Sequence, residues 1–309
     1  MTSLSVHILN PPDPGAFALL QSLCDPEIRL TSGEPSAPAD YEVLVTGRPR
    51  QEHLTTSPNL RLLIIPFAGL PSATRDLLQD FPGLAVHNLH HNAALTAEMA
   101  VTLMLAAAKF ILPCDRALRQ NDWRPRYHPL PALSLEGKTT LILGFGQVGQ
   151  RIGRACHALG MHVLAVRRQA QLPIQLEYPV EIHGPALLDQ LLPRAQILMI
   201  ALPATSATEG LLGERELALL PPGAVLVNIG RGAIVDQKAL YTALVNGQLG
   251  AAGLDVWYHY PRSQAEWEGT PPADFPFQAL DNVVLSPHRA GASTETEALR
   301  MTHLANLLN

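Results

Sequence analysis

Residues 139–160 read TTLILGFGQVGQRIGRACHALG, and this stretch decides the fold of the second half of the chain. A run of apolar and β-branched residues leads into three glycines, Gly144, Gly146 and Gly149, in the spacing G-x-G-x-x-G. A helical pattern follows, and then a second apolar run, HVLAV, at 162–166. A strand, a glycine turn, a helix and another strand in this order predict the phosphate loop of a Rossmann domain.

The positions of this loop have separate physical reasons. Gly144 permits the tight turn, Gly146 lets a pyrophosphate approach the backbone, and Gly149 lets the helix pack closely on the strand. Gln147 and Val148 open the helix, whose free N–H groups and partial positive charge attract phosphate. The alternative is a glycine-rich turn without a ligand, which the order of the flanking elements makes the weaker interpretation.

The residues after the second strand indicate which dinucleotide binds. A site for NAD normally carries an acidic residue there, which binds the ribose hydroxyls. This chain has Arg167 and Arg168 instead. Arginine offers a 2′-phosphate a planar, charged set of donors, so we predict NADP(H) as the cofactor. A solvated pair of surface arginines is the alternative.

Outward from this loop, short apolar runs alternate with helical patterns, which predicts α/β domains built on parallel sheets. A chain of 309 residues is long enough for two such domains. A continuous apolar helix is expected over 96–118. We predict a substrate domain at 1–96, rejoined by the last helix at 294–309, and a dinucleotide domain at 97–293. The predicted strands are 5–9, 41–46, 61–65, 84–88, 139–143, 163–166, 180–183, 197–202, 224–228, 251–256 and 283–286.

Composition narrows the class of protein. Apolar residues make up 47% of the chain and charged residues 16%, which argues against disorder. A formal net charge of -5 excludes the basic footprint of a nucleic-acid binder. Three scattered cysteines predict neither a disulfide framework nor a metal site. The start of the chain does not resemble a signal peptide and no run is long enough for a bilayer, so a cytoplasmic protein without a membrane partner is expected.

Two further residues follow predicted strands. Arg231 lies between glycines in VNIGRGAIVD, where a short loop at the carboxyl end of the sheet favours a carboxylate clamp over a surface arginine. His288 follows Pro287 in DNVVLSPHRAGAS, at the same predicted edge. A hydride-transfer enzyme needs a proton donor, and histidine is the usual one.

With these motifs in place, the chain resembles the D-2-hydroxyacid dehydrogenases, a family that includes glyoxylate/hydroxypyruvate reductases, formate dehydrogenase and phosphite dehydrogenase. The matching segments are GFGQVGQRIG, LPATSATEGLLG, LPPGAVLVNIGRGAIVD, AAGLDVW and SPHRAGAS, in the order of the family. They cover most of 135–293. The first domain matches more loosely, through LRLLIIPFAGL and LTAEMAVTLMLAAAK.

The resemblance implies a flavodoxin-like first lobe, a Rossmann second lobe, a cleft between them and a homodimer. Arg231 would hold and polarise the substrate, and His288 would be its acid or base. Asp255 would orient the nicotinamide carboxamide. The backbone amides of a loop in the first lobe would bind the substrate carboxylate, and four further residues would line the coenzyme. The amides are those of Phe67, Ala68 and Gly69, and the lining residues are Pro203, Thr208, Gly230 and Ala290.

One departure from the family concerns the partner of His288. The family usually has Glu five residues after the aspartate that matches Asp255, and this chain has Tyr260 there. A phenol can orient an imidazole but stabilises imidazolium less than a carboxylate does, so His288 is expected to titrate lower. A nearby acid, Glu266, Glu268 or Asp281, is the alternative partner.

Together these patterns predict an NADPH-dependent reductase that converts 2-oxo acids into D-2-hydroxy acids. Aromatic residues at Phe67, Trp257 and Tyr258 suggest a substrate side chain larger than that of glyoxylate. One alternative is an NADP-binding sensor with little or no turnover. Another is a dehydrogenase of a different small anion, although Ala68 replaces the lysine expected for phosphite, and Tyr260 the glutamine expected for formate.

Overall fold

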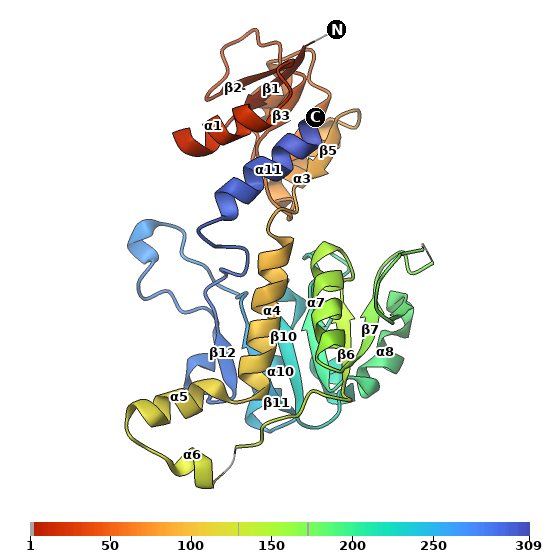
Figure 1. Cartoon of the computed structure of the whole chain (residues 1–309), viewed down its shortest axis with the longest axis vertical. Helices are drawn as coiled ribbons and strands as arrows, with labels where there is room; N and C mark the ends of the chain where they lie inside the picture. The colour runs from red at the N-terminus through yellow and green to blue at the C-terminus, as the bar shows by residue number, and fades with distance from the viewer. Residues whose placement is uncertain (1–2, 129, 172) are drawn as a thin grey trace. The chain divides into compact units, whose positions relative to one another are not determined.

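The computed structural model describes residues 3–128, 130–171 and 173–309 (Figure 1). The chain forms two compact units, one of residues 1–93 with 291–309 and the other of residues 94–290. The division expected from the sequence lies three residues later than each of these bounds. That the first unit binds the substrate and the second binds the coenzyme stays a prediction.

The first unit is a five-stranded parallel sheet in the order β2-β1-β3-β4-β5. This is the flavodoxin-like order of a doubly wound fold. The strands are β1 (Leu4–Ile8), β2 (Ile28–Ser32), β3 (Val43–Val45), β4 (Leu62–Ile65) and β5 (Ala85–Asn88).

Helices cover both faces of this sheet. On one face, α1 (Pro14–Leu23) and the C-terminal α11 (Thr296–Leu308) pack side by side over Val6, Ile8 and Val45 (Figure 1). The short helices α2 (Gln51–Thr55) and α3 (Ser72–Leu77) cover the other face, where Leu44 and Leu63 are buried. The return of α11 to the first unit agrees with the predicted path of the chain.

The second unit is a seven-stranded parallel sheet in the order β12-β11-β10-β9-β6-β7-β8. The order reverses between β6 and β9, which is the switch point where doubly wound sheets bind their ligands. The strands are β6 (Thr139–Leu143), β7 (His162–Val166), β8 (Glu181–His183), β9 (Ile197–Ile200), β10 (Ala224–Asn228), β11 (Leu249–Leu254) and β12 (Val283–Leu285).

Uniformly apolar strands suit this sheet because both of its faces are covered. Helices α4 (Ala93–Ala108) and α7 (Gln147–Ala158) bury one face, and α8 (Leu188–Leu191), α9 (Glu214–Leu219) and α10 (Gln237–Val245) bury the other (Figure 1). The prediction of two parallel-sheet α/β domains is therefore confirmed.

Two local predictions differ from the structure. Strand β2 was not expected, because IRLTS is an edge strand that is only partly buried and lacks an apolar run. The predicted helix over 96–118 was wrong as one piece: α4 ends at Ala108, and α5 (Ile111–Arg119) continues at 66° to it. Phe110 is left-handed at φ 52°, and Pro113 has no N–H to continue the helix and would clash with the preceding turn. A short helix, α6 (Arg124–Tyr127), follows.

Among the helices of residues 3–128, 130–171 and 173–309, none is by itself long and apolar enough to cross a bilayer. The bent pair α4–α5 meets the criteria of length and composition only when both helices are counted, and α4 contributes buried residues to the core of the second unit.

Candidate active site

The residues predicted for the coenzyme lobe all follow carboxyl ends of strands in the second unit. Because every pairing in this sheet is parallel, those ends lie along one edge. Only β11 separates β10 from β12, so the ends that precede Arg231 and His288 are about 10 Å apart. The segments are 144–149 after β6, 167–168 after β7, 203–208 after β9, 230–231 after β10, 255 after β11 and 288–290 after β12.

The glycine loop after β6 contains glycines with different constraints. Gly144 has φ +93°, and a Cβ there would lie 2.6 Å from the carbonyl oxygen of Ala201. A Cβ on Gly149 would lie 2.1 Å from the carbonyl oxygen of Gly144, so only glycine lets α7 approach the loop this closely. A Cβ on Gly146 would meet no protein atom within 4 Å. The fold itself therefore needs glycine at 144 and 149, whereas at 146 the missing side chain leaves open space beside the backbone.

The start of α7 completes a cradle that fits a dinucleotide pyrophosphate. Gly146 is the N-cap, it has no side-chain cap, and Gln147 and Val148 begin the helix. Uncapped N–H groups and the positive end of the helix dipole favour a phosphate at this point. The open space at Gly146 lies beside these groups, so the residues present fit the cofactor.

The two arginines after β7 have different surroundings. The Nε of Arg167 donates to the carbonyl oxygen of Gln169 at 2.8 Å, and its backbone N–H donates to His183 at 3.0 Å. Arg168 is exposed. Both residues follow the carboxyl end of β7, which pairs with the strand that precedes the phosphate loop. In this place they could receive a 2′-phosphate.

The loop after β9 is closed by its own threonines. The hydroxyl of Thr208 donates to the carbonyl oxygen of Pro203 at 2.7 Å and accepts from the N–H of Thr205 at 2.9 Å. Pro203 and Thr208 are thereby held in one turn beside Gly144. This turn is next to the switch point of the sheet, as a coenzyme-lining segment requires.

The loop that carries Arg231 packs closely against the backbone of Leu202 and Trp257. A Cβ on Gly230 would lie 2.5 Å from the carbonyl oxygen of Leu202, and one on Gly232 would lie 2.3 Å from that of Trp257. The glycines on either side of Arg231 are therefore required by packing. The guanidinium group is exposed and donates to the carbonyl oxygen of Gly230 at 2.7 Å.

Asn228 holds this loop through two hydrogen bonds, a role that was not predicted from the sequence. Its Nδ2 donates to the carbonyl oxygen of Arg231 at 2.9 Å, and its Oδ1 accepts from the N–H of Gly230 at 3.0 Å. The signal was present as a single amide at the end of the otherwise apolar strand AVLVN. A buried polar group at that point must find partners, and here the partners are backbone groups of the loop.

His288 meets the residue that replaces the family glutamate. Its Nδ1 lies 2.8 Å from the hydroxyl oxygen of Tyr260, and either group can donate, depending on the protonation of the ring. The same hydroxyl accepts from the backbone N–H of Trp257 at 3.0 Å. The tyrosine therefore orients the imidazole and leaves Nε2 as the nitrogen available to a ligand.

Asp255 lies at the end of β11 and is fully buried. One carboxylate oxygen accepts from the N–H of Arg289 at 2.9 Å and from the hydroxyl of Ser286, and the other accepts from the N–H of Ala290 at 2.9 Å. Ala290 is itself buried. Residues predicted to contact the coenzyme are thus joined to each other around the loop that carries His288.

The surroundings of His288 lower its pKa. Partial burial, followed by the positive charge of Arg231, lowers the pKa of His288, and the carboxylate of Asp255 opposes this. Because the residue keeps an exposed surface, water limits the shift. Burial raises the pKa of Tyr260, so its hydroxyl stays neutral near pH 7. Burial and the charge of Arg231 are thus the causes of the lowered pKa, and a lower value than in relatives with Glu at position 260 stays a prediction.

The three acidic residues proposed as alternative partners do not contact the His288 ring within the described residues. Glu266 accepts from the N–H of Arg262 at 2.9 Å, and Asp281 lies 3.3 Å from Arg116. Glu268 is exposed. Within the described residues, the hydrogen-bond partner of the His288 ring is Tyr260.

The aromatic residues read as a hint of substrate size have structural contacts. The ring of Trp257 is buried against Phe277, and the hydroxyl of Tyr258 donates to the carbonyl oxygen of Val235 at 2.8 Å. The ring of Phe67 packs over Gly47, where a Cβ would lie 2.2 Å from it. These protein contacts account for the three aromatic residues without a ligand. The three residues therefore give no information about the size of the substrate.

In the first unit, the predicted substrate loop follows β4. Among the described residues, no acceptor faces the backbone N–H groups of Phe67, Ala68 and Gly69. The side chain of Asn88, at the end of β5, donates to the carbonyl oxygen of Phe67 at 3.1 Å and holds the loop. Consecutive amides without an internal acceptor are a typical binding group for an anion.

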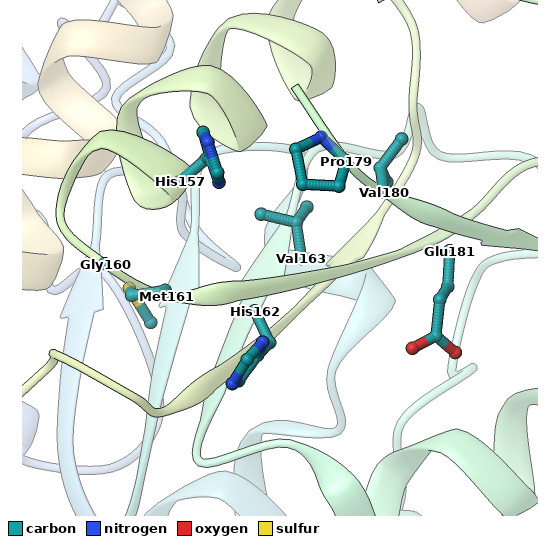
Figure 2. Close-up of a pocket in the computed structure, with 8 residues that line it drawn as sticks. All are labelled: His157, Gly160, Met161, His162, Val163, Pro179, Val180 and Glu181. Carbon is teal, nitrogen blue, oxygen red and sulfur yellow. The ribbon is translucent and has the colours of Figure 1, made fainter.

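A separate surface cavity of about 450 Å³ lies away from all of these residues. His162 begins β7 and Glu181 begins β8, so the cavity is at the amino ends of these strands, opposite the edge that carries Arg231 and His288 (Figure 2). Because of this location, we do not assign the cavity as the catalytic site. It is lined by His157, Gly160, Met161, His162, Val163, Pro179, Val180 and Glu181.

The chain is similar in sequence to proteins of a known dehydrogenase family. Residues 101–290 match the family described as D-isomer specific 2-hydroxyacid dehydrogenase, NAD binding domain. A glyoxylate reductase of Aeropyrum pernix is 35% identical over 314 residues, which cover 94% of this chain and 88% of that protein. One of Korarchaeum cryptofilum is 38% identical over 208 residues, covering 66% of this chain and 58% of that protein.

A solved structure is similar over both units. The D-isomer specific 2-hydroxyacid dehydrogenase from Xanthobacter autotrophicus Py2, in complex with NADPH and MES, superposes with a TM-score of 0.77 at 25% identity. The match covers 96% of this chain and 92% of that one. The chain belongs to the family of D-isomer specific 2-hydroxyacid dehydrogenases.

Proposed function

We propose that this protein is an NADPH-dependent reductase of small 2-oxo acids that forms D-2-hydroxy acids. The observation that carries the proposal is the joint position of Arg231 and His288 at one sheet edge, where the charge of Arg231 acts on His288. A cation for a carboxylate and a proton donor for a carbonyl oxygen are what this reduction requires. The Aeropyrum pernix relative is a glyoxylate reductase, which supports the same reaction class.

NADPH is the proposed cofactor because two arginines follow β7, where an NAD site has an acid. The similar Xanthobacter structure contains NADPH. The pyrophosphate would lie at Gly146 and the start of α7, and the 2′-phosphate at Arg167 and Arg168. Bound NADPH supplies the hydride that reduces C2.

The side chains would divide the remaining chemistry. Arg231 holds the substrate carboxylate and polarises the carbonyl group. His288 donates the proton on Nε2 to the carbonyl oxygen as the hydride arrives, and Tyr260 accepts from Nδ1–H of the imidazolium. Asp255 is fully buried, so it would act on the coenzyme through the backbone of Arg289 and Ala290, which it holds. Pro203, Thr208, Gly230 and Ala290 would lie around the coenzyme. The amides of 67–69 are the proposed second binding group for the carboxylate.

We also propose a homodimer in the cytoplasm. All three cysteines are unpaired, which fits a reducing compartment.

The test is steady-state turnover of NADPH and of NADH against a panel of 2-oxo acids. Arg231→Ala is expected to lower kcat/KM by roughly 10²–10³-fold, because a charged pair to the substrate is lost, and to leave the Kd of NADPH unchanged. Arg215→Ala is the matched control, since this arginine pairs with Asp189 on the same unit at 2.7 Å. Loss of NADPH binding together with turnover would mean that Arg231 is structural. Tight NADPH binding with no turnover of any 2-oxo acid would favour the sensor instead.

A further inference from the structure

The backbone of His288 is in a conformation that only a few per cent of residues other than glycine adopt. Its φ is 54°, in the left-handed region, and the residue lies in the short loop between β12 and Gly291. Such a conformation costs free energy and persists only where the surroundings enforce it. The loop must therefore contain restraints strong enough to hold this one residue.

Asp255 restrains the loop on both sides of His288. It accepts from Ser286, two residues before the histidine, and from the N–H groups of Arg289 and Ala290, directly after it. Because the carboxylate is fully buried, these donors replace the water that it has lost. The buried carboxylate of Asp255 needs the donors of the loop 286–290, and the loop is held in its conformation by that carboxylate.

Ser286 forms hydrogen bonds through each of its polar groups. Its hydroxyl donates to Asp255, and its N–H donates to the carbonyl oxygen of Leu254 at 2.8 Å. Its carbonyl oxygen accepts from the indole N–H of Trp257 at 2.8 Å and from the N–H of His288 at 3.0 Å. Ser286 is buried, so each of these bonds is shielded from competing water.

Trp257 links the backbone restraint to the ring of the histidine. Its backbone N–H donates to the hydroxyl of Tyr260, which in turn meets Nδ1 of His288. Its indole holds Ser286. The backbone and the side chain of His288 are therefore both anchored to the segment 255–260.

We infer that Ser286 is a positioning residue for His288: its hydroxyl joins Asp255 to the loop, beside the backbone carbonyl that holds Trp257, and thereby fixes the histidine backbone in its left-handed conformation. The inference rests on the proposed function only in taking His288 as the proton donor. The hydroxyl of the buried serine donates to Asp255, so its effect is transmitted through the backbone of 286–290.

The experiment compares Ser286→Ala, Ser286→Thr and Ser263→Ala in the full chain. Ser263 is exposed and makes no side-chain capping bond, so it controls for the substitution itself. Three quantities are measured: kcat with its NADPH Kd, the thermal midpoint, and the titration of the His288 ring by NMR. The histidine signal is assigned with His288→Gln.

For Ser286→Ala we expect kcat to fall roughly 10–100-fold, because a displacement of about 1 Å at a catalytic group costs this much. The Kd of NADPH stays at the wild-type value. The pKa of His288 rises toward that of an exposed histidine, because the freed ring moves into water and away from Arg231. Ser286→Thr retains the hydroxyl and restores both kcat and the pKa.

Two results would overturn the inference. One is a Ser286→Ala protein with the kcat and the His288 pKa of Ser263→Ala. The other is equal loss in Ser286→Ala and Ser286→Thr that follows the thermal midpoint, which is a structural effect alone. If wild-type protein turns over no 2-oxo acid, the proposed function fails, and the NMR titration still decides whether Ser286 positions His288.

Discussion

Alanine at Gly146 and alanine at Gly149 test the phosphate loop in opposite ways, although the two glycines are three residues apart. At Gly146 the backbone is extended with φ −90°, and a Cβ would meet no protein atom within 4 Å. We therefore expect Gly146→Ala to change the free energy of unfolding by less than about 1 kcal/mol, the range of a Gly-to-Ala change at a compatible backbone. The added methyl group would occupy the space that we propose for the pyrophosphate.

At Gly149 the same methyl group meets the protein itself. The Cβ would lie 2.1 Å from the carbonyl oxygen of Gly144, where real contacts are not shorter than 3.0 Å. The helix must retreat by roughly 1 Å, and overpacking of this kind costs about 1–3 kcal/mol. Gly149→Ala is therefore expected to lower stability and, because the cradle opens, also to weaken NADPH binding.

Urea unfolding without ligand and calorimetric titration with NADPH measure the two effects separately. For Gly146→Ala, displacement of the pyrophosphate removes one or two charge-assisted hydrogen bonds worth about 1.5–3 kcal/mol each, so the Kd rises at least about tenfold. Wild-type affinity in Gly146→Ala would refute the assignment of this loop to the pyrophosphate. A loss of stability equal to that of Gly149→Ala would refute the distinction between the two glycines.

Three other predictions follow from charges at named positions. Tyr260→Phe removes the acceptor at Nδ1 of His288. Since imidazolium gains more from this hydrogen bond than the neutral ring does, the pKa of His288 is expected to fall further, and the pH limb of kcat/KM for reduction to move down with it. A limb that moves up contradicts this. Arg168→Ala, alone and with Arg167→Ala, is expected to raise the Kd of NADPH about tenfold or more and to leave that of NADH unchanged; equal losses for both dinucleotides would contradict NADP selectivity. Burial lowers the pKa of His91 to about 4, below the 6.5 of an unperturbed histidine, so its contribution to stability is present above pH 6.5 and is lost as the pH falls toward 4. Urea midpoints are expected to show a loss of about 2 kcal/mol between pH of about 7.5 and 5, and His91→Asn to lessen it; an unchanged pH dependence in the variant contradicts this.

Much of the second unit could be predicted because its information is local. Strands β6 and β10 have the bounds expected from their sequence, since each is a short apolar run closed by turn residues. The three glycines and the two arginines after β7 lie within thirty residues of one another. Parallel strands bring their carboxyl ends to one edge, so Arg231 and His288 could be assigned to that edge without coordinates.

Elsewhere the pattern was ambiguous. The run from 96 to 118 is apolar enough for one helix, and only the observed turn at Phe110 separates α4 from α5. The aromatics Trp257 and Tyr258 follow a strand, as ligand contacts would, yet their rings have protein partners. Composition alone does not distinguish a residue that lines a site from one that supports it.

What the sequence by itself determined is the order of strand, loop and helix, and the polar residues that each loop brings to the sheet edge. What only the tertiary structure decided is how those residues are held. The bonds from Asp255 to the His288 loop join positions 31 to 35 residues apart, and they exist because β11 and β12 pair in one particular register. Neighbouring residues in a chain constrain local conformation, whereas register is set by the packing of the whole sheet, and the geometry around His288 depends on that packing.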